Sequence, residues 1–117
     1  DGMFAIGKLI ELLSSVGTRL SQMLADAPRR AFLQTTIPCV FELKGGIMRK
    51  MSEDSLDKEA SFIDGIKVHF GQDWALVLPD QYHSSVHIVA EAKEVKTAQR
   101  LLDEYRKKVE SWKKELQ

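Results

Sequence analysis

The sequence has few of the features that mark whole classes of protein. Cys39 is the only cysteine among the 117 residues, so an intrachain disulfide is impossible and a reducing cytoplasm is the expected location. The 17 basic and 17 acidic residues balance, so no overall field favours nucleic acid. Apolar runs stay far below the about 18 residues needed to span a bilayer, and no signal-peptide pattern is found. We expect neither a nucleic-acid nor a membrane partner.

What the sequence does contain suits one globular domain with a small appendage. Hydrophobic residues make up 44% and charged residues 29%, which is ordinary for a soluble domain with a modest core. Cys39 has no His, Asp or Cys near it in the sequence, so we interpret it as a buried apolar residue and not as a nucleophile or metal ligand. The chain starts Asp1-Gly2-Met3, which favours a fragment of a longer protein.

Two helices are expected at the start of the chain. Gly17 suits the residue after the end of a first helix over 3–16. Thr18 is the expected N-cap of a second, short helix, and Pro28 ends it. The first helix has its apolar residues at helical spacing, namely Phe4, Ile6, Leu9, Ile10, Leu13 and Val16.

The middle of the chain has the alternation and the turn residues of short strands. Pro38 predicts that the first strand lies at a sheet edge or contains a bulge. Asp64-Gly65 is among the strongest signals for a two-residue hairpin. Alternation within 66–70 predicts a sheet with one covered and one freer face. We expect strands over 31–41, 60–63, 66–70, 74–78 and 86–92, and a helix from Gly45-Gly46 to about Ser55.

The chain closes with an expected helix over 94–116, whose apolar residues recur at steps of three and four. It would be roughly 35 Å long, whereas strands of five or six residues span about 17–20 Å. We therefore expect the sheet to cover only its first half. The order of elements predicts an α+β fold: an antiparallel four- or five-stranded sheet with two helices on one face, preceded by two N-terminal helices.

Three stretches within residues 31–106 carry a specific similarity, namely Ile63–Val68, Trp74–Val77 and Ala90–Lys93. Through them, residues 31–106 resemble the C-terminal (fourth) domain of the phosphohexomutases, a family that includes phosphomannomutase and phosphoglucomutase. The resemblance implies a TATA-binding-protein-like architecture for residues 29–117. It also implies that residues 1–28 are the last helices of a preceding mutase-like domain. Within residues 38–49, a narrower subgroup is resembled by Pro38-Cys39, Glu42-Leu43-Lys44-Gly45 and Met48-Arg49. Its members are mutase-like regions fused behind a sugar-1-phosphate nucleotidyltransferase, of the mannose-1-phosphate guanylyltransferase or phosphomannomutase type.

In the resembled family, a loop reading Arg-Pro-Ser-Gly-Thr-Glu-Pro holds the phosphate of a sugar phosphate. Counted from Trp74, the arginine position is Leu78, whereas the proline is retained as Pro79. One cation is lost and one anion is gained, which argues against strong phosphate binding. The remaining positions of the loop are filled in order by Asp80, Gln81, Tyr82, His83 and Ser84.

Two smaller features each leave two interpretations open. His69 and His87 on the freer face, with His83 and Asp80 in the loop, are either surface residues or a His-His-Asp metal cluster; we expect no metal site. Lys44-Gly45-Gly46, at the expected helix start, either holds an anion through free backbone N–H groups or simply forms a turn into the helix.

Two hypotheses about function follow. The first is a non-catalytic C-terminal domain of a sugar-nucleotide or sugar-phosphate enzyme of the GDP-mannose type, with a degenerate phosphate loop. The second is an association module. A parent that remains an active phosphomannomutase is a further alternative. The resemblance implies that the phosphoserine and the metal-binding aspartates lie outside this chain, so we expect no catalysis by the chain alone, and Mg²⁺ as a cofactor of the parent only.

We also expect self-association, because both ends of the chain carry apolar helical surface. Leaving about 400 Å² of it exposed would forgo roughly 10 kcal/mol at about 25 cal/mol per Å². The expected terminal helix places Val109, Trp112 and Leu116 beyond the reach of short strands. Either the two end helices pack together within one chain, or the surfaces meet across a two-fold axis; we favour the dimer.

Overall fold

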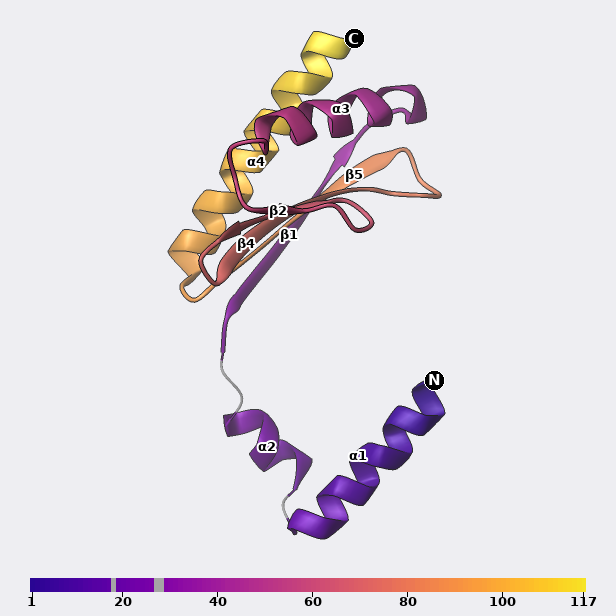
Figure 1. Ribbon diagram of the computed structural model, residues 1–117, viewed down its shortest axis with the longest axis vertical. Coiled ribbons are helices and arrows are strands. Elements are labelled where there is room, and N and C mark those ends of the chain that lie inside the picture. Colours follow the sequence, from indigo (N-terminus) through magenta and orange to yellow (C-terminus); the bar gives the residue numbers. More distant parts are fainter. Residues whose placement is uncertain (18, 27–28) are drawn as a thin grey trace.

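A computed structural model describes residues 1–17, 19–26 and 29–117, and it has the predicted α+β fold (Figure 1). After two helices the order is strand, helix, four strands, helix, as expected. The elements are α1 (Gly2–Val16), α2 (Leu20–Asp26), β1 (Ala31–Pro38), α3 (Phe41–Asp54), β2 (Ala60–Ser61), β3 (Ile66–Phe70), β4 (Asp73–Pro79), β5 (Ser85–Ala92) and α4 (Val95–Leu116).

The five strands form one antiparallel sheet in the order β1-β5-β4-β3-β2. The last strand of the chain, β5, therefore lies between the first strand and β4. β1 is an edge strand and ends at Pro38, so the edge position predicted from this proline is confirmed. At an edge, the missing N–H of a proline costs the sheet no hydrogen bond.

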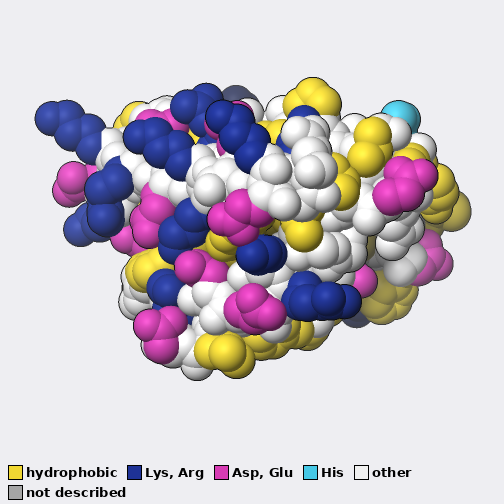
Figure 2. Space-filling model, turned by 90° about the horizontal axis from the view of Figure 1, so that it is seen from above, with side chains coloured by type: hydrophobic (Ala, Val, Ile, Leu, Met, Phe, Trp, Pro, Cys, Tyr) yellow, Lys and Arg dark blue, Asp and Glu magenta, His cyan; other side chains and the backbone are white. Residues whose placement is uncertain are grey.

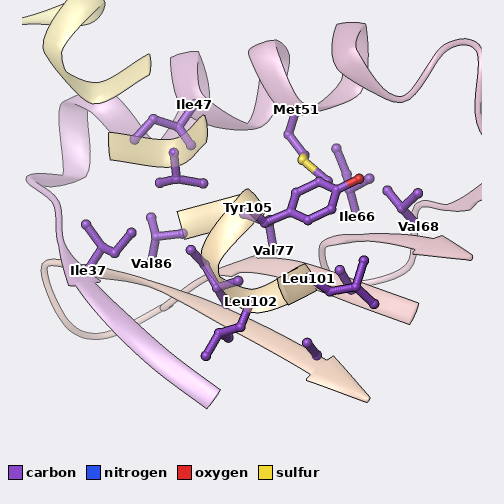
Figure 3. Close-up of a cluster of buried hydrophobic side chains, with 14 of the residues drawn as sticks. Ile37, Ile47, Met51, Ile66, Val68, Val77, Val86, Leu101, Leu102 and Tyr105 are labelled. Carbon is purple, nitrogen blue, oxygen red and sulfur yellow. The ribbon is translucent and has the colours of Figure 1, made fainter. Parts of the chain in front are cut away.

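Helices α3 and α4 cover one face of the sheet and enclose the core between them (Figure 3). Tyr105 of α4 is fully buried, and its ring points toward the part of the core where Met51 and Ile66 lie. Cys39 is buried at the edge of this core, and burial raises the pKa of its thiol although Lys113 and Lys44 act in the opposite direction. The interpretation of Cys39 as a buried, unreactive residue fits this environment.

The second half of α4, which we expected to extend beyond the sheet, has a helix of the same chain as its partner. Helix α3 lies against it, so Val109 is fully buried and Trp112 and Leu116 pack partly buried on the core. The two helices approach closely at Gly46: a Cβ built on this glycine would lie 2.8 Å from a methyl carbon of Leu116. A short sheet can thus bury a long helix when a second helix extends the apolar surface.

The start of α3 also differs from the prediction. It begins at Phe41, four residues before the predicted start at Gly45, and β1 ends at Pro38 instead of continuing to 41. The reason is the spacing of Leu43, Ile47 and Met51, which lie four residues apart and all contact the core. This pattern requires the first helical turn to precede Leu43.

The hairpin between β2 and β3 forms, but β2 is shorter than predicted and the connection 62–65 has four residues instead of two. Asp64 has a φ of 56° and Gly65 a φ of 150°, both on the positive side. A Cβ on Gly65 would lie 2.7 Å from the carbonyl oxygen of Val77, so glycine is required by contact as well as by conformation.

The N-terminal helices lie apart from the sheet (Figure 1). Helix α1 has no buried residue, and Gly17 follows its end as predicted, in a left-handed conformation with a φ of 66°. The expected cap at Thr18 and the expected stop at Pro28 lie outside the described residues. Most large apolar side chains of α1 and α2 are exposed, the most open being Met3, Phe4, Ile6, Ile10 and Leu24, whereas Leu13 and Met23 are partly buried.

Charges of both signs are mixed on the face of the molecule shown in Figure 2, which agrees with the zero net charge. Within the described ranges, no helix is both long enough and apolar enough to cross a bilayer.

Candidate functional site: the loop between β4 and β5

The loop over 80–84 joins the end of β4 to the start of β5, and it contains the residues singled out from the sequence. A depression of about 500 Å³ lies beside it. Leu78 and Pro79 at the end of β4 line this depression together with Asp64 of the neighbouring hairpin. The loop contributes Asp80, Gln81 and Tyr82, and β5 contributes His87.

The carboxylate of Asp80 organises the loop. Its Oδ1 accepts hydrogen bonds from the backbone N–H groups of Tyr82, at 2.8 Å, and His83, at 2.9 Å. The Nδ1 of His83 lies 3.2 Å from the same oxygen. Oδ2 lies 2.8 Å from the Nε2 of His87. The bond from His87, followed by those from the two backbone N–H groups, holds the pKa of Asp80 far below its usual range, so this carboxylate is charged.

His87 reaches the loop because of the strand register. It stands opposite Leu78 on β4 and opposite Thr36 on β1. Its Nδ1 lies 3.0 Å from the Thr36 hydroxyl. Because the charged carboxylate of Asp80 can only accept, Nε2 carries the proton toward Asp80, and in the neutral ring Nδ1 accepts from Thr36. Both ring nitrogens of His87 therefore have a hydrogen-bond partner.

Lys44 of α3 holds the loop from the other side. The residue is only 7% exposed, and its ammonium donates to the carbonyl oxygen of Asp80 at 2.6 Å and to that of His83. The same ammonium lies 3.7 Å from the centre of the Phe41 ring. The buried charge thus has two hydrogen-bond partners and an aromatic neighbour, as a buried cation needs.

The structure separates the three residues of the predicted anion site. Lys44 is directed at the loop, no atom lies within 4 Å of a Cβ built on Gly45, and one built on Gly46 meets Leu116. Gly45 and Gly46 lie inside α3, so the premise that they start the helix is wrong. Anion binding by these residues stays a prediction.

The histidines do not gather around a common centre. His69 lies away from the loop, with its Nε2 3.1 Å from the Ser61 hydroxyl. His83 and His87 both bind the carboxylate of Asp80. In the parts of the chain that the structure describes, no group of three or more His, Cys, Asp or Glu residues could hold a metal ion. These residues do not fit the Mg²⁺ that the family resemblance implies for the parent.

Chemically, Thr36, His87 and Asp80 form a hydroxyl–imidazole–carboxylate chain, an order that also occurs in hydrolases. Such a chain needs free N–H donors to stabilise an oxyanion. The adjacent N–H groups of Tyr82 and His83 already bind Asp80. The arrangement therefore fixes the loop and leaves no assembled acyl-transfer site.

Thr36 was not among the site residues identified from the sequence, and His87 was considered there only as a surface residue or a metal ligand. Thr36 is far from the loop in the sequence and reaches it only through the β1–β5 register. The role of His87 as a partner of the loop could have been found, because the strands flanking the loop are antiparallel and Leu78 was already identified. Pairing across the loop places His87 beside that position.

No family model matches the chain. Comparison with individual proteins is more informative. A "Probable phosphoglucosamine mutase" of Pyrococcus horikoshii is 31% identical over 121 positions, covering 99% of this chain and 26% of the relative. Another from Methanosarcina acetivorans is 35% identical over 96 positions, covering 80% and 21%. The "Phosphoglucosamine mutase" of Methanococcus vannielii is 27% identical over 106 positions, covering 88% and 24%.

The homologues of this chain are phosphoglucosamine mutases. These relatives support the description of the chain as a phosphohexomutase-like domain, in agreement with the resemblance seen in its strands. The chain spans about a quarter of the length of these relatives. In this phosphohexomutase-like domain, the position that resembles the arginine of a phosphate loop is the half-buried Leu78, and a carboxylate stands two residues later.

Proposed function

We propose that residues 29–117 form a non-catalytic, C-terminal-type domain of a longer sugar-phosphate or sugar-nucleotide enzyme. In this proposal the loop over 80–84 no longer binds a sugar phosphate. The observation that carries this proposal is the hydrogen bonding of Asp80, whose carboxylate accepts hydrogen bonds from the backbone N–H groups of Tyr82 and His83. The described residues that line the depression include no lysine or arginine to pair with a dianion, and two of them, Asp64 and Asp80, are acidic.

For the parent, we propose a mannose-1-phosphate guanylyltransferase or phosphomannomutase-like enzyme of the GDP-mannose type, on the resemblance within residues 38–49. The names of the relatives favour a glucosamine phosphate as an alternative substrate. A parent that is still an active mutase would need another cation in place of the missing arginine. The Mg²⁺ of such a parent belongs to the part of the enzyme that carries the reacting phosphate.

Titration of the chain with mannose 1-phosphate, and separately with a glucosamine phosphate, tests the proposal. We expect the backbone amide signals of residues 80–84 to stay in place up to low millimolar ligand. Saturable shifts of the Tyr82 and His83 amides at micromolar ligand would contradict it. Shifts confined to Lys44, Gly45 and Gly46 would instead support the separate anion site.

A second proposed role, self-association, is supported by the exposed apolar side of α1. Met3 is 84% and Ile6 is 60% exposed, and α1 buries no residue. Helical spacing places Ile6, Leu9, Ile10 and Leu13 on one side, which suits a partner helix or sheet. The end of α4 was also expected to contribute, but Val109 is already buried and Trp112 half-buried within the chain. The proposed dimer therefore depends on α1 and not on α4.

A further inference from the structure

The donors around Asp80 converge from four directions on a single carboxylate. Two are successive backbone N–H groups, those of Tyr82 and His83, and two are imidazole nitrogens, from His83 and His87. Successive N–H groups that point into one concavity are a general arrangement for binding an anion. Here the anion belongs to the protein itself.

The backbone of the loop is also held by contacts that do not involve the carboxylate of Asp80. Lys44 binds the carbonyl oxygens of Asp80 and His83. The N–H of Asp80 donates to the carbonyl oxygen of Ser85 at 3.0 Å, and the N–H of Cys39 donates to that of Ser84 at 2.9 Å. These contacts use main-chain atoms of the loop, so they remain available when the side chain of residue 80 is changed.

We propose that the loop is an anion site occupied by its own carboxylate: Asp80 fills a position that would otherwise take a small oxyanion such as phosphate. This inference deepens the proposed loss of phosphate binding by naming the group that blocks the site. It differs from simple charge repulsion, because the block depends on the hydrogen bonds that Asp80 accepts as well as on its charge.

Two substitutions at one position separate these explanations. Asp80→Ala removes the carboxylate and frees all four donors. Asp80→Asn removes the charge, yet its amide oxygen can still accept from the N–H groups of Tyr82 and His83. Self-occupation predicts that only the alanine variant gains anion binding, whereas charge repulsion predicts that both variants gain it equally.

The probe is inorganic phosphate, titrated at constant ionic strength and pH into the whole chain and followed by amide shifts. We expect Asp80→Ala to show saturable shifts of the Tyr82 and His83 amides, with at least tenfold higher affinity than the wild type and Asp80→Asn. Adding His87→Gln to Asp80→Ala removes one imidazole donor and should lower the gained affinity at least threefold.

Every outcome bears on the inference. If the loop of Asp80→Ala loses its ordered signals, phosphate should restore them, and failure to restore them would overturn the inference. An ordered Asp80→Ala loop without phosphate binding, or equal gains in the alanine and asparagine variants, would also overturn it. Phosphate binding at the wild-type loop would contradict the proposed function together with the inference that rests on it, whereas the outcomes above overturn the inference and leave the proposed function intact.

Discussion

The sheet domain and the N-terminal helices use apolar side chains in opposite ways. In the sheet domain, the helices and the covered sheet face bury residues such as Ile47, Val77 and Tyr105 completely. In α1, which is similarly rich in large apolar residues, none is buried. The same kind of residue therefore stabilises one region and leaves the other dependent on a surface outside it. Helical periodicity identifies an apolar face, but the identity of its partner depends on the rest of the fold.

Core truncation should give the largest contrast with α1. We expect Tyr105→Ala to lower the free energy of unfolding by about 3–5 kcal/mol, because it removes a fully buried aromatic ring. Tyr105→Phe is the control. The Tyr105 hydroxyl is buried without a hydrogen-bond partner among the described residues, so its removal should cost nothing. Urea unfolding followed by tryptophan fluorescence measures both, and a large loss in the phenylalanine variant would show that the hydroxyl has a partner.

The second largest loss of stability is expected from removing the buried ammonium group of Lys44. Lys44→Met keeps the length of the side chain but removes both hydrogen bonds to the loop carbonyls. We expect a loss of about 1.5–3 kcal/mol, as for hydrogen bonds to a charged group. The amide signals of residues 80–84 should broaden or shift while those of β3 stay in place. An unchanged loop would mean that Lys44 does not hold it.

Adjacent glycines in α3 offer a smaller and more selective test. Gly45→Ala should stabilise the domain by about 0.5–1 kcal/mol, because its site is open and alanine favours the helix. Gly46→Ala places the same methyl group 2.8 Å from a methyl carbon of Leu116, so it should gain less or lose stability. Thermal unfolding of the two variants decides, and equal gains would mean that Leu116 moves aside freely.

The smallest effect on unfolding is expected in α1, where Ile6→Asp combined with Ile10→Asp should change the stability of the sheet domain by less than about 0.5 kcal/mol. The same pair should abolish self-association if α1 forms the dimer contact. Sedimentation equilibrium is the measurement: the wild type should exceed 13.3 kDa at micromolar concentration and the variant should not. Ser15→Asp, on the opposite side of α1, is the matched control and should still associate.

Local sequence signals were sufficient to predict the order of elements. The alternation in β3 and β5, the turn at Asp64-Gly65 and the edge proline Pro38 each depend on neighbours in the chain. The start of α3 was mispredicted because Gly45-Gly46 resembles a helix boundary locally, whereas burial of Leu43 sets the true one. The partner of the second half of α4 depends on the direction of α3, which no local pattern specifies.

The candidate site also combines features that local sequence specifies with features that depend on distant segments. Its position was predicted, because Trp74 and Pro79 fix the place of the loop relative to the strands. Its internal contacts were not, because Lys44 arrives from α3 and Thr36 from β1. Such contacts between distant segments are set by sheet register and helix placement, which local spacing does not determine.

The position of β5 between β1 and β4 has a consequence for how the domain can be assembled. β2, β3 and β4 can form a meander from neighbouring segments, but β1 has only β5 as a partner, with Ala31 opposite Ala92 and Pro38 opposite Ser85. Bringing β1 and β5 together closes the long segment between them, which costs chain entropy before any contact between the two strands is gained. During synthesis, the first strand must therefore wait unpaired until the last one emerges. The order of the strands makes folding a late event, completed only when nearly the whole domain is present.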